Sequence, residues 1–128
     1  MGLLLDTCCL LWFVSDRSRL STAARQHVED PAVLFASAIP AFEIGVLTAK
    51  GRIQLQAPPE MWFAQALARH SIHALDVTWE IAVASTALPS LHNDPVDRLL
   101  ISTALQHAIT LVTPDVKIAT YPGVQVIW

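Results

Sequence analysis

The sequence predicts an α/β fold in which helices flank a mainly parallel sheet, within a single domain that spans residues 1–128. Two observations carry this prediction. Short, uninterrupted apolar runs, typical of strands buried on both faces of a sheet, alternate with helical patterns of roughly ten residues. The length of 128 residues suits one domain, and no repeat, low-complexity tract or linker divides the chain.

The individual elements follow from these patterns. The apolar runs predict strands at residues 2–5, 33–36, 72–75, 110–113 and 124–128. Apolar residues at helical spacing predict helices at residues 21–28, 39–50, 60–70, 78–88 and 95–107. Two helix ends carry their own signals, because Ser21 is a common N-cap and Gly51 follows the second helix.

The composition is apolar for a small soluble protein, since hydrophobic residues make up 53% of the chain. A domain of this size buries only about two-thirds of its unfolded surface. We therefore expect some apolar side chains to lie in an interface with a partner or a second copy. The apolar stretches are too short to cross a membrane, and Asp6 interrupts an opening run without basic residues, so we expect neither a membrane span nor a signal peptide.

The only two cysteines, Cys8 and Cys9, are adjacent in the sequence. Neighbouring cysteines rarely pair with each other, so we expect no disulfide framework and a reducing, cytoplasmic location. Two vicinal thiols can also bind a metal, an interpretation that the lack of further cysteines disfavours.

Four acidic side chains from distant parts of the chain are expected at one edge of the sheet. Asp6 follows the first strand, and Asp115 lies two residues beyond the fourth. Glu43 is near the start of the helix after the second strand, and Asp97 begins another helix. Open parallel sheets carry their functional residues beyond the carboxyl ends of the strands. The four carboxylates are therefore predicted to meet there.

Such a cluster predicts a divalent cation. Like charges a few ångströms apart repel one another unless a cation cancels them, and ligands that are all oxygen suit Mg²⁺ or Mn²⁺. These ions activate water and stabilise the leaving oxygen in phosphodiester cleavage. The net charge of −3 neither supports nor excludes a nucleic-acid substrate, because the placement of charge matters more than its total.

Each acid also has a structural interpretation. Asp6 can cap the helix that follows the first strand, and Glu43 can lie on a solvated helix face. Asp94 before Pro95 reads as an N-cap, with Asp97 favoured in the first helical turn. The segment from Thr113 to Asp115 likewise reads as a Thr cap with an acid in the first turn. Only the conjunction of the acids favours a metal site.

Several segments resemble VapC-like toxins of the PIN-domain ribonuclease family over essentially the whole chain. The most specific is an HxDPxDRLLI motif followed by LVTxD. The matching segments are LLLDTCCLLW at 3–12, RLSTAARQHV at 19–28, FEIGVLTAKGRIQL at 42–55, LPSLHNDPVDRLLISTAL at 88–105 and LVTPDVKIATYPGVQVIW at 111–128. The chain departs from the family's frequent pattern at Cys8–Cys9, Phe42 and Val96, none of which is a carboxylate.

The resemblance implies a parallel sheet in the order 3-2-1-4-5, flanked by helices. It implies an endoribonuclease that depends on Mg²⁺ or Mn²⁺ and acts as the toxin of a type II toxin–antitoxin pair. The expected partners are an RNA substrate, a small antitoxin and a second copy in a homodimer. The implied catalytic residues are Asp6, Glu43, Asp97 and Asp115, of which Asp6 and Asp97 bind the metal, with Asp94, Thr7, Thr113 and Arg98 as possible auxiliary residues.

Some alternatives stay open at this point. A PIN fold without catalysis could bind only RNA or protein, although the presence of all four acids argues against it. Arg98 could contact phosphate or an acid, and a structural role is favoured. His92 could contribute to a metal site, but a loop histidine that caps the start of a helix is favoured. An antitoxin is expected to cover apolar surface and to insert a basic residue among the carboxylates.

Overall fold

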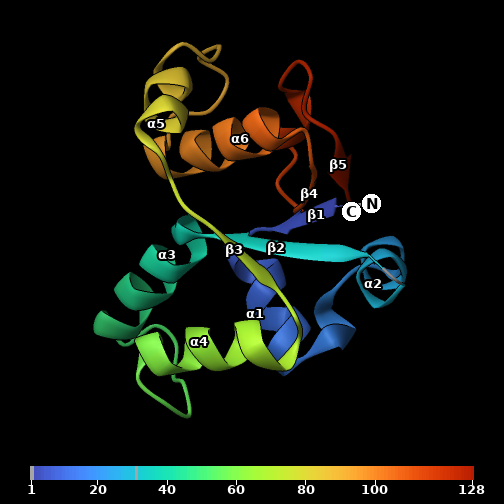
Figure 1. Ribbon diagram of the computed structural model, residues 1–128, viewed down its shortest axis with the longest axis vertical. Coiled ribbons are helices and arrows are strands. Elements are labelled where there is room, and N and C mark those ends of the chain that lie inside the picture. The colour runs from blue at the N-terminus through green and yellow to red at the C-terminus, as the bar shows by residue number, and fades with distance from the viewer. Residues whose placement is uncertain (1, 31) are drawn as a thin grey trace.

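The computed structural model describes residues 2–30 and 32–128, which form a parallel sheet between two layers of helices (Figure 1). The strand order is β3-β2-β1-β4-β5, so the predicted order is confirmed. Neighbouring strands are parallel throughout. The strands are β1 (Gly2–Leu5), β2 (Val33–Ser37), β3 (His73–Leu75), β4 (Thr110–Val112) and β5 (Val126–Ile127).

The predicted helices are present, with ends that differ by at most two residues. The α-helices are α1 (Thr7–Ser15), α2 (Thr22–Glu29), α3 (Ala38–Ala49), α4 (Pro59–Arg69), α5 (Trp79–Thr86) and α6 (Pro95–His107), and short 3₁₀ turns are η1 (Arg17–Arg19) and η2 (Ile118–Thr120). Ser21 caps α2 as predicted, because its side chain accepts a hydrogen bond from the amide of Ala24. The sequence predicted no bounds for α1, whose side chains are almost all apolar and therefore show no helical alternation.

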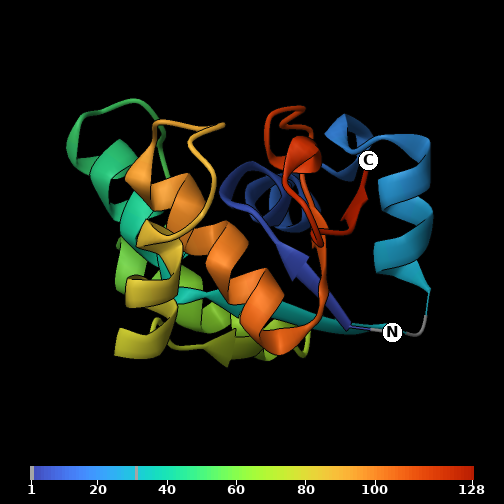
Figure 2. The same ribbon diagram turned by 90° about the horizontal axis from the view of Figure 1, so that it is seen from above.

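The sheet separates two hydrophobic cores because successive side chains of a strand point to opposite faces. Leu3 and Leu5 pack with α1 and α2 in one core, and Leu4 packs with α6 in the other. Figures 1 and 2 show α1 and α4 on one side of the sheet and α5 with α6 on the other. This arrangement buries β1 completely from Leu3 onward.

The prediction that every strand is buried on both faces holds at the centre of the sheet and is wrong at the edge. Leu111 and Val112 of β4 are buried like the residues of β1. In β3, however, His73 and Ala74 are exposed, because this edge strand is only three residues long and leaves its outer faces uncovered. Ile72, which was expected in the strand, precedes it and is buried.

Several large apolar side chains lie on the surface. Trp79 is 76% exposed, so it lies outside the hydrophobic core. The others are Val33, Phe42, Met61, Val83, Leu91, Val116 and Trp128. Among residues 2–30 and 32–128, no helix has the length and apolar character that crossing a membrane requires.

Candidate metal centre

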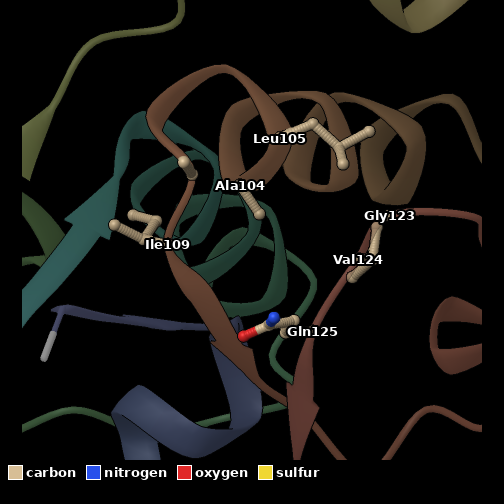
Figure 3. A pocket seen from close by; sticks show the side chains of 7 residues that line it. Ala104, Leu105, Ile109, Gly123, Val124 and Gln125 are labelled. Carbon is tan, nitrogen blue, oxygen red and sulfur yellow. The ribbon is translucent and has the colours of Figure 1, made fainter.

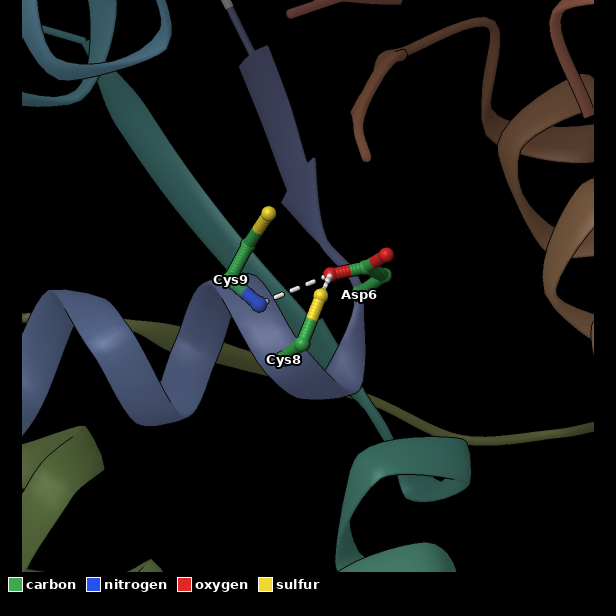
Figure 4. Close-up of side chains that lie close together, drawn as sticks. All are labelled: Asp6, Cys8 and Cys9. Atoms are coloured by element: carbon green, nitrogen blue, oxygen red, sulfur yellow. Dashed lines mark hydrogen bonds between the residues drawn. The ribbon is translucent and has the colours of Figure 1, made fainter. Parts of the chain in front are cut away.

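Asp6 lies at the carboxyl end of β1, where the chain turns directly into α1. Its amide donates a hydrogen bond to the carbonyl of Val112 in β4 (3.2 Å), so the carboxyl ends of the two central strands lie side by side. Its Oδ1 accepts hydrogen bonds from the amide of Cys9 (2.8 Å) and the thiol of Cys8 (3.3 Å), as Figure 4 shows. Asp6 is therefore both the N-cap of α1 and a carboxylate fixed at the sheet edge.

Glu43 is held by the first residue of α1. The hydroxyl of Thr7 donates to Oε1 of Glu43 at 2.5 Å, a contact between residues 36 positions apart in the sequence. It places the second turn of α3 beside the start of α1. Thr7, proposed as an auxiliary residue, therefore orients Glu43. Because Thr7 directly follows Asp6 in the chain, this contact also connects Glu43 to Asp6.

Asp97 and Asp115 meet at His92, for which the sequence favoured a role in capping a helix. Nε2 of His92 lies 3.1 Å from Oδ2 of Asp115, with which it forms a hydrogen bond, and 3.1 Å from Oδ2 of Asp97. Its Nδ1 accepts a hydrogen bond from the amide of Asp94 at the start of α6 (3.2 Å). The HxD spacing was the only signal of this role, and it does not reveal that the loop turns the imidazole toward Asp115.

Asp115 is positioned by a turn and not by the helix start that the sequence predicted. The amide of Asp115 donates to Oγ1 of Thr113 (3.2 Å), and Oδ1 of Asp115 accepts from the amide of Lys117 (2.9 Å). These are short side-chain turns, and only the 3₁₀ turn η2 follows them. The buried side chain of Thr113 thus holds Asp115 by accepting a hydrogen bond from the backbone amide of Asp115.

The pKa values of Asp97 and Asp115 depend on burial and on the charges of neighbouring acids. Burial, together with the negative charges of Asp94, Glu43 and Asp115, raises the pKa of Asp97 to about 6 despite the opposing effect of His92. Burial also raises the pKa of Asp115, but hydrogen bonds from His92 and the Lys117 amide outweigh it and hold this pKa below its usual value. The negative charge of Glu43 on α3 therefore contributes to the raised pKa of Asp97 on α6.

The carboxylate donors have the chemistry that suits a divalent cation. Asp6 and Glu43 each have one carboxylate oxygen held by a donor of the protein, and Asp115 has both oxygens held. Within the described part of the chain, the second oxygen of Asp6 and of Glu43 accepts no hydrogen bond, and these hard donors suit Mg²⁺ or Mn²⁺. The pKa of Asp97 is raised first by burial and further by the neighbouring carboxylates, whose negative charges a bound cation would offset.

The neighbouring thiols fit a metal less well. Sulfur atoms of Cys8 and Cys9 lie close to an oxygen of Asp6, within 4.8 Å of one another, and both cysteines are free (Figure 4). A thiol binds metal as the thiolate. The pKa of Cys9 is raised by a hydrogen bond with Cys8, by burial and by the charge of Asp6, so Cys9 stays protonated.

Asp94 and Arg98 both form hydrogen bonds with the backbone. Oδ1 of Asp94 accepts from the amide of Val96 (2.9 Å), which makes Asp94 the N-cap of α6 that the sequence predicted. Arg98 takes part in none of the ion pairs between described residues. Its guanidinium instead donates to backbone carbonyls at the end of α5 and in the α5–α6 connection, which is the structural role that the sequence favoured.

Two pockets lie apart from the acids. One of about 180 Å³ lies at the amino end of β4, lined by residues of the C-terminal part of α6 and by residues 123–125 (Figure 3). The other, about 770 Å³, is a groove between the end of α1, residues 54–57 and α4. Neither contains a carboxylate, so neither is part of the candidate metal centre.

One prediction concerns the metal-free protein. Because the pKa of Asp97 is raised from 3.8 to about 6, its ionisation opposes folding, and stability is lost as pH rises through this range. Asp97→Asn should therefore raise the free energy of unfolding at pH 7.5 in EDTA by on the order of 1–2 kcal/mol. Urea unfolding at pH 7.5 and pH 4.5 measures this, and the gain should disappear at pH 4.5. An equal gain at both pH values would contradict the argument.

Known proteins resemble this chain in sequence and in fold. It is 38% identical over 119 residues to Ribonuclease VapC22 of Mycobacterium tuberculosis, which covers 92% of this chain and 90% of that protein. Its fold is similar to that of VapBC2 from Rickettsia felis bound to a promoter DNA fragment, with a TM-score of 0.72, 16% identity and coverage of 98% and 97% of the two chains. A toxin–antitoxin complex from Klebsiella pneumoniae gives a TM-score of 0.67, with 24% identity and coverage of 95% and 94%. The PIN domain model matches residues 3–124, and the chain therefore belongs to the PIN domain family.

Proposed function

We propose that this protein is an endoribonuclease that depends on Mg²⁺ or Mn²⁺ and acts in the cytoplasm as the toxin of a type II toxin–antitoxin pair. The observation that carries the proposal is that Asp97 and Asp115 meet at His92, near enough to Glu43 for its charge to contribute to the raised pKa of Asp97. The 38% identity to a protein named as a ribonuclease supports the same reaction.

Asp6 and Asp97 are proposed to hold the cation, with Glu43 and Asp115 completing the pocket directly or through water. When bound, such an ion activates water and stabilises the leaving oxygen of a phosphodiester. The residues of the chain supply the rigid placement that this chemistry needs. Asp6 is fixed by the start of α1, and Glu43 is fixed by the hydroxyl of Thr7. Asp115 is fixed by the Lys117 amide.

We also propose that a small antitoxin and a second copy of the chain bind this protein. Exposed apolar side chains such as Phe42, Trp79 and Val116 supply the surface that such contacts would cover. The groove between α1 and α4 includes the apolar side chains of Trp62 and Met61 beside polar ones such as Gln65 and Arg69, a mixed lining that an amphipathic helix could cover. Solved toxin–antitoxin complexes are among the structures with this fold. An antitoxin arginine among the carboxylates would replace the cation without a change of fold.

The test is RNA cleavage by the purified protein. Cleavage should require Mg²⁺ or Mn²⁺, stop in EDTA, and be lost in a variant in which Asp6, Glu43, Asp97 and Asp115 are all changed to the corresponding amides. Expression should arrest growth, and neither the quadruple variant nor wild type expressed with its antitoxin should do so. Equal arrest by wild type and the quadruple variant would instead indicate a toxic binding function, which is the catalytically inactive alternative.

A further inference from the structure

His92 contacts two of the four acids, and the proposed function gives it no role. We propose that His92 is a positioning residue for the metal centre, whose Nε2–H holds the carboxylates of Asp97 and Asp115 in the orientation that binds the cation. This inference rests on the proposed metal-dependent cleavage.

The hydrogen bonds of the ring determine which nitrogen carries the proton. The amide of Asp94 donates to Nδ1 of His92 at 3.2 Å, and a backbone amide can only donate. Nδ1 is therefore the acceptor of the ring, and the proton of the neutral imidazole is on Nε2. Nε2 forms a hydrogen bond with Oδ2 of Asp115 at 3.1 Å and also lies 3.1 Å from Oδ2 of Asp97.

Hydrogen bonds of the His92 backbone help to hold the imidazole in this position. The amide of His92 donates to the hydroxyl of Tyr121 (2.8 Å), and its carbonyl accepts from Arg98 (3.5 Å). The side chain of His92 is only 12% exposed. Donors and acceptors from the start of α6 and from the segment before β5 thus fix the ring, which leaves it little freedom to swing away from the acids.

The same contacts argue against a direct metal–nitrogen bond. A metal on Nε2 needs the lone pair of that nitrogen, which would move the ring proton to Nδ1. Nδ1 would then present a donor to the Asp94 amide, also a donor, and the hydrogen bond between them would be lost. The arrangement of the loop therefore favours Nε2 as a donor to the carboxylates and leaves the cation to oxygen ligands.

Residues that orient metal ligands in this way have measurable effects. Removing such a partner typically lowers metal affinity or activity by about 10- to 100-fold. Without the Nε2–H, Asp115 loses its donor and Asp97 loses the neighbouring positive end of that N–H dipole, so the repulsion between the two carboxylates is less well offset. The loss should appear in metal binding and in the rate of cleavage, and not in the binding of RNA.

The experiment is titration of Mn²⁺ into metal-free protein by calorimetry, with wild type, His92→Leu and His92→Gln. The amide of glutamine can place an N–H near the position of Nε2, whereas leucine cannot. His92→Leu should lower Mn²⁺ affinity by about 10-fold or more, and His92→Gln should recover most of the loss. In cleavage assays, kcat should fall in the leucine variant while KM for RNA stays constant. His27→Gln, on α2, is the matched control and should bind Mn²⁺ as wild type does.

The outcomes separate the possible explanations. Wild-type Mn²⁺ affinity in His92→Leu, or a glutamine variant as weak as the leucine variant, would overturn the inference. A loss of Ni²⁺ binding that exceeds the loss of Mn²⁺ binding would identify His92 as a ligand, because imidazole suits Ni²⁺, and would also overturn it. If the leucine variant does not fold, His92→Asn, with a shorter amide, replaces it with the same expected loss. A further outcome is that the Mn²⁺ affinities follow the expected order, with wild type highest, His92→Gln next and His92→Leu lowest, while wild type cleaves no RNA. In that case the proposed function fails, but His92 is still a positioning residue of a metal site.

Discussion

Asp97→Asn and Asp6→Asn are each expected to reduce RNA cleavage to background, a loss of roughly 1,000-fold or more, while the fold stays intact. An amide keeps the shape of the side chain but removes the negative charge that is proposed to hold the cation. For Asp97, the metal-free variant should also be more stable than wild type, because the pKa of the native carboxyl is about 6. Lost activity combined with gained stability is a result that damage to the fold would not produce.

Asp94→Asn is the matched control for Asp97→Asn. Asp94 lies at the same end of α6, but its carboxylate caps the helix by accepting from the amide of Val96. Asparagine is about as good an N-cap as aspartate, so the helix should remain. We expect only a mild loss of cleavage, measured with Mg²⁺ on the same RNA. Cleavage by Asp97→Asn at the wild-type rate would show that Asp97 does not hold the metal.

The fold could be predicted because its pattern is local. Each central strand is a run of apolar residues that lies next to a helix with polar and apolar positions at helical spacing, and caps such as Ser21 and Asp94 fix the helix starts. The elements without such a pattern were the ones predicted poorly. Helix α1 is apolar on nearly all sides because it packs beneath the sheet, and β3 is a short edge strand whose residues are mostly exposed.

The site was predictable where position along a strand determines it. The carboxyl end of β1 places Asp6, and that of β4 places Asp115, as the rule for parallel sheets requires. The contacts that orient the acids depend on tertiary structure, such as the bond from Thr7 to Glu43 across 36 residues and the bond from His92 to Asp115 across 23. No spacing rule predicts these pairs, because the loops between them can take many paths.

The loop that carries His92 also explains the position of Arg98. From the first turn of α6, the guanidinium donates to the carbonyls of Ser85 (2.9 Å), Leu88 (2.8 Å) and Pro89 (2.8 Å). It also donates to the carbonyl of His92 and, at 3.3 Å, to the hydroxyl of Tyr121. One side chain therefore donates to carbonyls from the end of α5 to His92 and connects this segment to Tyr121.

Arg98→Ala should accordingly lower the free energy of unfolding by on the order of 2–4 kcal/mol, because several charge-assisted hydrogen bonds are lost together and partly buried carbonyls are left without a donor. Arg98→Lys should recover less than half of this loss, since a single ammonium group cannot replace the planar fork that reaches separate carbonyls. Urea unfolding in EDTA measures the effect without a contribution from metal binding.

Arg25→Ala is the matched control for Arg98→Ala, and the comparison distinguishes position from charge. Arg25 is exposed on α2 and forms a surface ion pair with Glu29 at 3.2 Å, and such pairs contribute less than about 1 kcal/mol. The two variants remove the same charge, so a large difference between them would arise from the carbonyl contacts of Arg98. Because Arg98 also holds the carbonyl of His92, Arg98→Ala should weaken Mn²⁺ binding as well, and Arg25→Ala should not. Equal stability losses in the two variants would mean that the α5–α6 connection keeps its path without the arginine, and that the placement of His92 depends on Tyr121 and Asp94 alone.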